Sequence, residues 1–421
     1  MDAHTSVCLP DVVCLERTYS QDMKALSLAL LAIIGHPLFA QSEWVNPFIG
    51  TGGHGHTYPG ATAPFGMVQL SPDTRLDGWD GCSAYHYSDS AIYGFSHTHL
   101  SGTGVSDYGD ILLMPMLDLK WTSEEVKAAF AHKNESAEPG FYQLNLDNGI
   151  RAELTASSRV GVHRYTFPKG SKPYLLIDLL HRDRLTSAQL EIIDKQNIRG
   201  HRHSTAWAID QKLYFHIRLS EEWKDLLKDP EHPEHRQALQ FKKLKKPLTI
   251  WVGLSSTSAE AAAMNLDAEA KDKSFDDILQ QTQEDWNREL GKIDVTASEE
   301  QKTIFYTALY HTMIVPNLFS DVDGKYRGMD GEVHQAKGPH YTVFSLWDTY
   351  RAAHPLYTLI DHERTRDFIL TFDRMFTQTG RLPVWELAGN ETECMIGYHA
   401  ASVLADAAVK DLSPLDAERA L

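Results

Sequence analysis

The segment Phe141–Ala156 has the sequence FYQLNLDNGIRAELTA, and it determines the fold class expected for the first half of the chain. Apolar residues alternate with polar ones before and after the dipeptide Asn148-Gly149, which is the pattern of two half-buried strands. An Asn-Gly dipeptide tolerates the positive φ angles of a type I′ turn. The segment therefore predicts a β-hairpin with a tight turn at this dipeptide.

The same alternation of apolar and polar residues occurs at Leu213–Leu219 and at Leu248–Leu254. From Trp44 to about Thr257, such segments follow one another without helical patterns between them. Strands that are not separated by helices favour an antiparallel arrangement. We therefore expect residues 41–257 to form an antiparallel β-sandwich domain.

The composition changes after Ser258, where Ala, Asp, Glu and Lys dominate and few β-branched residues occur. This composition favours helices, so we expect a helical linker over residues 258–297. Ser298 with Gln301 then has the pattern of a capping box, which marks the start of a helix and of a second domain.

Further helices are expected at about residues 350–359, 363–376 and 395–409, and Gly380 lies where a helix should end. Four helices are few for an independent helical domain, because the outermost ones would lack packing partners. Residues 298–421 therefore predict a helical domain that is only partly present, as in a truncated chain.

The charge balance excludes one class of partner. The chain has 421 residues and a formal net charge of −17, with 40 Lys plus Arg against 57 Asp plus Glu. A protein that binds nucleic acid normally presents basic residues to the phosphates, so we expect no nucleic-acid partner. We interpret the short basic cluster as a solvated sheet edge; it comprises Lys242, Lys243, Lys245 and Lys246.

The N-terminus has the pattern of a targeting segment. Lys24 precedes the apolar run Ala25–Ile34, and the small residue Ala40 follows it. We expect a signal peptide at residues 23–40, an upstream extension before it, and export to the periplasm or the extracellular space. The apolar run is shorter than the roughly 18 residues of a membrane span, so no membrane span is expected.

Two cysteines follow residue 40, Cys82 and Cys394. They are too few for a fold that depends on several disulfides. The sequence leaves open whether they pair.

Four segments combine Gly, aromatic, acidic and His residues without periodicity, which is the composition of functional loops on a rigid scaffold. They comprise residues 46–66, 78–89 and 94–110, and a fourth group at 344–355 and 380–392. The first segment is rich in Gly, but no Gly-Lys-Ser/Thr follows and no strand leads into a helix. We therefore do not interpret it as a phosphate-binding loop.

Two His-x-His pairs, His54/His56 and His97/His99, are spaced so that both rings of a pair lie on one side of a strand. Such pairs are able to bind zinc, and a zinc-dependent hydrolase is one alternative. His residues on Gly-rich loops also form hydrogen bonds to the backbone or to a substrate. Because no further thiolate or carboxylate follows at a fixed spacing, we favour the hydrogen-bonding interpretation.

A tryptophan adjoins a carboxylate three times, at Trp79-Asp80, Trp347-Asp348 and Trp385-Glu386. Sugars have apolar CH faces and a rim of hydroxyl groups, so aromatic rings with carboxylates are a natural lining for a saccharide site. A single pair is equally well a core tryptophan beside a helix-capping acid. The repetition of the pair favours a carbohydrate ligand.

Together these segments resemble glycoside hydrolase family 92, the calcium-dependent, exo-acting α-mannosidases that trim mannose from N-glycans and mannans. The resemblance covers nearly all of the chain from Trp44 onward. It rests on four motifs in the order of the family: NPFIGT (46–51), GWDGCS (78–83), GFSHTHLSGTG (94–104) and LWDTYR (346–351).

The resemblance implies an N-terminal β-sandwich packed on an (α/α)6 toroid, with a mannose pocket at their junction. It implies that Trp79 lines the pocket floor and that Asp348 accepts hydrogen bonds from the hydroxyls of the terminal sugar. Five further residues are candidates for the mannose pocket, because they lie near the motifs in sequence and have suitable chemistry: Asp80, Arg351, Glu386, Asn390 and Glu391.

The resemblance also implies an inverting mechanism, in which one carboxyl protonates the leaving oxygen and a second carboxylate activates water. It implies a Ca²⁺ ion that holds two adjacent hydroxyls of the sugar. The segments that carry the acid, the base and most calcium ligands are expected beyond Leu421, so no residue of this chain is assigned as catalytic or as a metal ligand. We therefore expect the fragment alone to be inactive.

A second hypothesis is a complete, non-catalytic, secreted carbohydrate-binding protein that keeps the pocket without the catalytic pair. The sequence indicates neither the linkage preference nor the oligomeric state.

Overall fold

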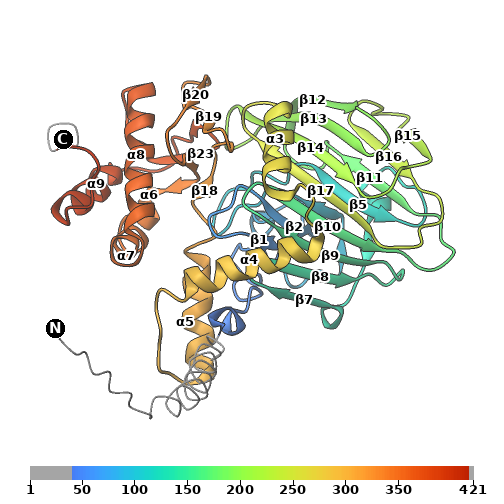
Figure 1. The fold of residues 1–421 in the computed structure, drawn as a ribbon, viewed down its shortest axis with the longest axis horizontal. Coiled ribbons are helices and arrows are strands. Elements are labelled where there is room, and N and C mark those ends of the chain that lie inside the picture. Colours follow the sequence, from blue (N-terminus) through green and yellow to red (C-terminus); the bar gives the residue numbers. More distant parts are fainter. Residues whose placement is uncertain (1–39, 417–421) are drawn as a thin grey trace, which may run out of the picture. The chain divides into compact units, whose positions relative to one another are not determined.

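The computed structural model describes residues 40–416 of the chain. The expected upstream extension and nearly all of the expected signal peptide lie outside these residues. Among the described residues, no helix combines the length and the apolar character needed to cross a membrane. Residues from Gln41 onward form one compact unit, in which a β-rich part is followed by a helical part, as the sequence predicts (Figure 1).

The β-rich part contains two large antiparallel sheets. The first has seven strands in the order β1 (Ala61–Thr62), β2 (Gln69–Asp73), β4 (Gly94–Ser96), β5 (Leu112–Met116), β11 (Tyr174–Asp178), β16 (Arg236–Gln240) and β15 (Asp225–Lys228). The second has eight strands in the order β12 (Arg184–Ile192), β13 (Asn197–Thr205), β14 (Gln211–Leu219), β17 (Leu248–Ser255), β10 (Val160–Thr166), β9 (Arg151–Ala156), β8 (Phe141–Asn145) and β7 (Glu135–Glu138). In Figure 1 the second sheet runs from β12 at the top to β7 at the bottom.

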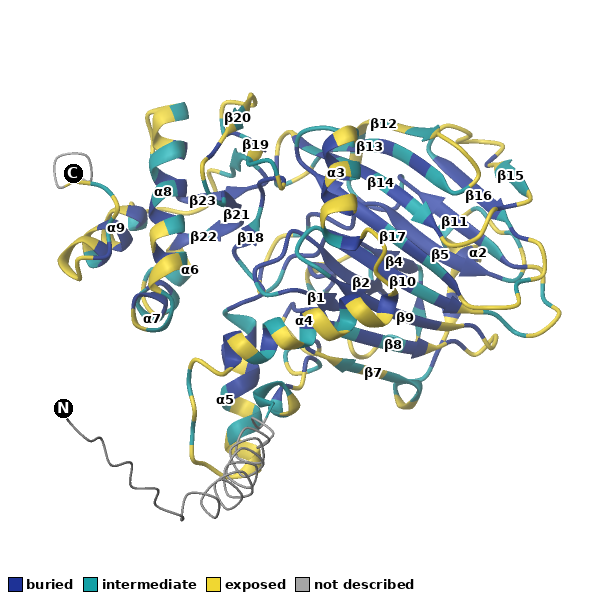
Figure 2. Cartoon of the chain, viewed as in Figure 1, coloured by how far each residue is buried: buried dark blue, intermediate teal, exposed yellow. Residues whose placement is uncertain are grey.

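Both sheets contribute side chains to one hydrophobic core. Leu113 and Leu176 of the first sheet belong to the same buried cluster as Leu154 and Ile250 of the second sheet. Along β14, buried and half-buried residues alternate through all nine positions, as the period-two pattern predicts. Figure 2 shows the strands of both sheets mainly in the colours of buried and half-buried residues.

The hairpin predicted around Asn148-Gly149 is confirmed as β8 and β9, but the type I′ turn is wrong. Of this dipeptide only Gly149 has a positive φ, of 87°. The Gly149 N–H donates to the carbonyl oxygen of Leu146 at 2.9 Å, and the Leu146 N–H donates to the carbonyl oxygen of Ile150 at 2.9 Å. This is a three-residue loop in which a type I turn is followed by a left-handed glycine.

Two helices follow the second sheet: α3 (Ala259–Ala270) and α4 (Phe275–Leu290). Leu266 of α3 and Ile278 of α4 belong to one buried cluster with Val160 and Val162 of β10. The segment expected as a helical linker therefore consists of helices that pack on the outer face of the sheet.

The helical part begins with α5 (Glu299–His311), whose N-cap Ser298 and N3 residue Gln301 form the predicted capping box. The other helices are α6 (Leu346–Thr349), α7 (Ala353–Ile360), α8 (His362–Thr379) and α9 (His399–Val409). Gly380 ends α8 in the left-handed conformation, with φ 70°, as predicted. A second hydrophobic cluster contains Phe368 and Phe372 of α8 and Leu404 of α9.

Short strands and turns connect the helices of this part. The strands are β18 (Asn317–Leu318), β19 (Lys325–Arg327), β20 (Val333–Gln335), β21 (Tyr341–Thr342), β22 (Phe344–Ser345), β23 (Trp385–Leu387) and β24 (Asn390–Glu391). The remaining short elements of the β-rich part are η1 (Gln41–Trp44), η2 (Trp79–Gly81), β3 (Ala91–Ile92), α2 (Ser123–Val126), β6 (Ala128–Ala129) and η3 (His132–Asn134). The three-stranded sheet β22-β23-β24 carries residues of the site described next.

Candidate functional site

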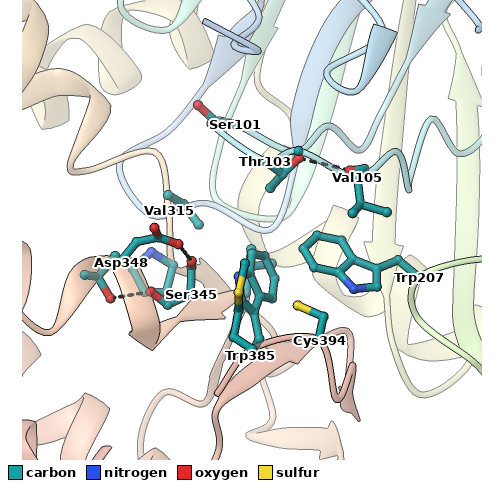
Figure 3. A pocket seen from close by; sticks show the side chains of 15 residues that line it. Ser101, Thr103, Val105, Trp207, Val315, Ser345, Asp348, Trp385 and Cys394 are labelled. Carbon is teal, nitrogen blue, oxygen red and sulfur yellow. Dashed lines mark hydrogen bonds between the residues drawn. The ribbon is translucent and has the colours of Figure 1, made fainter. Parts of the chain in front are cut away.

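A cavity of about 520 Å³ lies where loops of the β-rich part meet loops of the helical part (Figure 3). The β-rich part contributes the loop Ser101–Val105 and Trp207. The helical part contributes Val315, Pro316, Val343, Ser345, Asp348, Thr349, Trp385, Cys394 and Met395. A volume of this size accommodates a small ligand such as a sugar residue.

Two tryptophans in contact form an aromatic wall of the cavity. The ring centroids of Trp207 and Trp385 lie 4.3 Å apart, and their planes are inclined by 44°. Trp385 lies in β23 and is buried, whereas Trp207 lies in the loop between β13 and β14 and is half-buried. Side chains with this much flat apolar surface suit the CH face of a sugar ring.

Asp348 provides the carboxylate of the cavity. It lies in the short helix α6, directly after β22, and its side chain is exposed. The hydroxyl of Ser345 donates a hydrogen bond to Asp348 Oδ2. The other oxygen, Oδ1, accepts no hydrogen bond from the described residues, so it is free to accept one from a ligand hydroxyl.

The loop Ser101–Val105 forms the opposite side of the lining, and hydrogen bonds fix its shape. The Ser101 hydroxyl lies 2.9 Å from that of Thr57, and the Thr103 hydroxyl donates to the carbonyl oxygen of Val105 at 3.1 Å. Gly102 has a φ of 73°, a conformation that a residue with a side chain adopts only at a cost.

Trp79 and Asp80 are not among the residues that line this cavity. Trp79 is 56 % exposed and packs on the rings of His54 and His56, with centroid distances of 4.8 and 4.5 Å. Asp80 Oδ1 lies 2.7 Å from His54 Nδ1 and 3.3 Å from His56 Nε2. The hydrogen bond with His54 lowers the pKa of the Asp80 carboxyl. His56 Nδ1 lies 2.7 Å from the carbonyl oxygen of Thr103, which joins this cluster to the cavity loop.

Glu386 is buried and is not among the residues that line the cavity. Its Oε1 accepts hydrogen bonds from the Thr342 hydroxyl and from the Gly389 N–H, each at 2.7 Å, while Oε2 has no partner among the described residues. Burial raises the pKa of this carboxyl to about 8, so the group is mainly protonated at neutral pH. Glu386 therefore supports β23 from the interior and does not line the cavity.

Asn390 and Glu391 also support the lining and do not form part of it. The Asn390 side chain accepts from the Asp210 N–H at 3.2 Å and donates to the Asp210 carbonyl oxygen at 3.3 Å, which holds the loop that carries Trp207. Glu391 Oε1 accepts from the Trp385 N–H at 3.0 Å. Arg351 is exposed and does not line the cavity.

Of the seven residues expected in the site, Asp348 alone is in the lining that the structure describes. The sequence did not indicate Trp207. Its position in the sequence could have identified it, because Trp207 lies in the turn between two segments of alternating polarity. Such turns form loops at the edge of a sheet, where side chains are available to bind a ligand.

The pair His97/His99 forms buried hydrogen bonds, as the favoured interpretation expects. His97 Nδ1 lies 2.7 Å from the carbonyl oxygen of Ile111, and His99 Nε2 lies 2.6 Å from Asp73 Oδ1. Burial lowers the pKa of His97 to about 4. Because the two rings are occupied by different partners, this pair does not form a common metal site. Cys82 and Cys394 are free thiols, one buried and one exposed.

The cavity can hold a sugar but does not by itself form a calcium site. Calcium takes about six to eight oxygen ligands, usually with several carboxylates, and catalysis of glycoside hydrolysis uses two carboxyl groups. The described lining contains one carboxylate, Asp348, together with hydroxyls of Ser and Thr.

Comparison with known proteins defines the class as a glycoside hydrolase. Residues 44–259 match the glycosyl hydrolase family 92 N-terminal domain, and residues 261–421 match the glycosyl hydrolase family 92 catalytic domain. The chain therefore belongs to glycoside hydrolase family 92, and the resemblance seen in the sequence is confirmed.

Three relatives illustrate this membership. A family GH92 α-mannosidase from Bacteroides thetaiotaomicron, in complex with mannoimidazole, has a similar structure with a TM-score of 0.86 and 34 % identity, over 90 % of this chain and 54 % of that one. A family GH92 inverting mannosidase from the same organism has a TM-score of 0.84 and 30 % identity, over 92 % and 55 %. An uncharacterized secreted glycosidase of Arthroderma benhamiae is 26 % identical over 77 % of this chain and 48 % of its own length. The chain thus spans about half the length of these relatives.

Proposed function

We propose that this protein acts in the removal of terminal α-linked mannose from N-glycans or mannans. One observation carries the proposal: the paired indoles of Trp207 and Trp385 lie in one cavity with the carboxylate of Asp348, within a family 92 fold. The structures that it resembles at 34 and 30 % identity are described as mannosidases.

The residues of this chain would bind and orient the sugar. The exposed surface of Trp207, which Trp385 supports from behind, packs against the CH face of the ring, and Asp348 Oδ1 accepts a hydrogen bond from a ring hydroxyl. The Ser101–Val105 loop lines the other side, and we propose that it limits the cavity to the terminal residue of a glycan. Binding of this kind favours an exo mode of action.

The proposed chemistry is calcium-dependent inversion, in which the ion, when bound, grips two adjacent hydroxyls of the sugar and helps to flatten its ring. The described lining has one carboxylate, so we propose that the acid, the base and most calcium ligands come from residues outside those that the structure describes. By the same argument the described part alone binds sugar without cleaving it.

Three further proposals accompany the function. The two sheets with their common core are proposed to be a β-sandwich, and the helices α5 to α9 to be part of an (α/α)6 toroid. Export to the periplasm or the extracellular space is proposed from the N-terminal sequence pattern and from the secreted relative of Arthroderma benhamiae.

The test is an assay of mannose release by the protein purified from its native source. The substrates are an α-linked mannobiose and its β-linked isomer, each with and without EDTA. The proposal expects release from the α-linked substrate only, loss of release with EDTA, and β-mannose as the first product in a rapid NMR measurement. Release that persists after exhaustive chelation contradicts the calcium-dependent mechanism.

A non-catalytic carbohydrate-binding protein is the second candidate, and the single carboxylate of the described lining favours it. Calorimetry with the α-linked mannobiose, together with the release assay, separates the two functions. Saturable binding of the α-linked disaccharide without release by the native protein supports a binding protein, whereas neither binding nor release contradicts both candidates.

A further inference from the structure

Three potential metal ligands meet beside the cavity loop, outside the lining itself. His54 Nδ1, His56 Nε2 and a carboxylate oxygen of Asp80 all lie within 4.8 Å of one another. The two histidines belong to the Gly-rich loop at residues 50–56, and Asp80 belongs to η2. Two separate loop segments thus converge on one point.

The hydrogen bonds of His56 determine which of its nitrogens can bind a cation. Its Nδ1 lies 2.7 Å from the carbonyl oxygen of Thr103, which is only an acceptor, so Nδ1 carries the proton. In the neutral ring Nε2 then has a lone pair, and this lone pair faces Asp80 Oδ1 at 3.3 Å. Two acceptors face each other there unless a proton or a metal ion lies between them.

The side chain of His56 is nearly fully buried, with 4 % of its surface exposed, so solvent does not satisfy Nε2. The carbonyl behind the ring has the arrangement common in metal sites, where a hydrogen bond to the second nitrogen fixes the tautomer and the orientation of the ligand. This arrangement is a second observation, independent of the clustering, that indicates a cation.

Access and charge agree with this interpretation. The side chain of His54 is 69 % exposed, so an ion can reach the cluster from solvent. Asp80 is half-buried and supplies a negative charge to offset the charge of the ion. Its hydrogen bond to His54 favours the ionised carboxylate.

We propose that His54 Nδ1, His56 Nε2 and Asp80 Oδ1 bind a transition-metal ion of the zinc class, with a fourth position open to solvent. Two imidazoles and one carboxylate suit zinc, which prefers nitrogen and sulfur ligands, and do not suit calcium, which requires oxygen. This site is separate from the proposed calcium chemistry of the cavity.

The ion would join two segments outside the cavity to the loop Ser101–Val105, which lines it. It links the loop of His54 and His56 to η2, and through the hydrogen bond of His56 to Thr103 it reaches the cavity loop. Trp79 packs on both imidazoles, so its position depends on the ligands. The ion is a positioning element, and the proposal does not depend on the glycosidase activity.

The test is a titration of Zn²⁺ into tag-free, metal-stripped protein in competition with a chromophoric chelator. The proposal expects one equivalent that is lost, or weakened at least about tenfold, in His54→Ala and in Asp80→Asn. Zn²⁺ is expected to raise the thermal unfolding midpoint of the unmodified protein and to have less effect on both variants. An excess of Ca²⁺ is not expected to displace it.

The matched control is His334→Ala. His334 Nε2 lies 2.9 Å from Asp330 Oδ2 in a partly exposed His–Asp pair that no third ligand joins among the described residues, so this variant should bind Zn²⁺ like the unmodified protein. Any zinc that binds elsewhere in the chain, including its first 39 residues, binds equally to all variants, so it does not affect the difference between them. The proposal is overturned if no saturable binding occurs, if His54→Ala and Asp80→Asn bind as the control does, or if Ca²⁺ displaces the ion.

Discussion

Trp207 and Trp385 contact each other with ring centroids 4.3 Å apart, although 178 positions of the chain separate them, so the β-rich and helical parts jointly form the aromatic wall. Trp207 depends on the helical part for its position, because Asn390 forms hydrogen bonds to the backbone of Asp210 in the same loop. The cavity therefore requires both parts to be folded.

Replacement of Trp207 by alanine should weaken the binding of an α-linked mannobiose by about fivefold, because the sugar loses an aromatic surface worth about 1 kcal/mol. Calorimetry measures this loss. Trp121→Ala is the matched control, since Trp121 is also half-buried but packs on the core of the two sheets. Equal affinities of the two variants would show that Trp207 does not contact the sugar.

Asp348→Asn should weaken sugar binding more than it changes stability. The Asp348 side chain is exposed, and its one hydrogen bond within the described residues comes from Ser345, so the free energy of unfolding should change by less than about 1 kcal/mol. A hydrogen bond from a sugar hydroxyl to a charged oxygen is worth about 1.5 to 3 kcal/mol, so affinity should fall more than tenfold. Calorimetry and urea unfolding measure the two effects. Unfolding of the variant at room temperature would make Asp348 a structural residue.

Much of the fold could be predicted because it depends on local patterns. The alternation at Leu213–Leu219 and the capping box at Ser298 each specify an element by residue types a few positions apart. The turn at Asn148-Gly149 was predicted less well, because a three-residue loop and a type I′ turn both require a left-handed glycine and differ only in the neighbouring residue.

The site was less predictable because it depends on which residues meet across the chain. Asp348 was identified from its motif, but the neighbouring acid Glu386 points into the interior, where Thr342 and Gly389 bind it. A strand places successive side chains on opposite faces, so in Trp385-Glu386 the indole lines the cavity and the carboxyl does not. Adjacency in sequence was therefore a poor guide to membership of the lining.

The buried Glu386 should make the protein less stable as the pH rises. Its pKa is raised from 4.5 to about 8, so between these values the folded protein keeps a proton that the unfolded chain loses, and unfolding releases it. The contribution of this group to the free energy of unfolding is fully present below about pH 4.5 and is lost as the pH rises toward about 8.

Glu386→Gln removes this titration while Gln Oε1 can still accept from Thr342 and Gly389. In urea unfolding between about pH 5 and pH 8, the free energy of unfolding should fall less steeply for the variant than for the unmodified protein. At about pH 8 the two losses should differ by more than about 1 kcal/mol. Burial also raises the pKa of Asp183, but this group is unchanged in the variant and cancels in the comparison. Parallel curves for the two proteins would contradict the raised pKa of Glu386.

A bound sugar should protect Cys394 from alkylation. Cys394 is exposed and lines the cavity, so iodoacetamide should modify it readily in the free protein, and a saccharide that fills about 520 Å³ should slow the reaction several-fold. Cys82 is the internal control, because it is buried and burial raises the pKa of its thiol, which lowers the fraction of reactive thiolate. Mass spectrometry of the two peptides gives both rates in one sample. If saturating saccharide leaves the rate at Cys394 unchanged, the sugar binds outside this cavity.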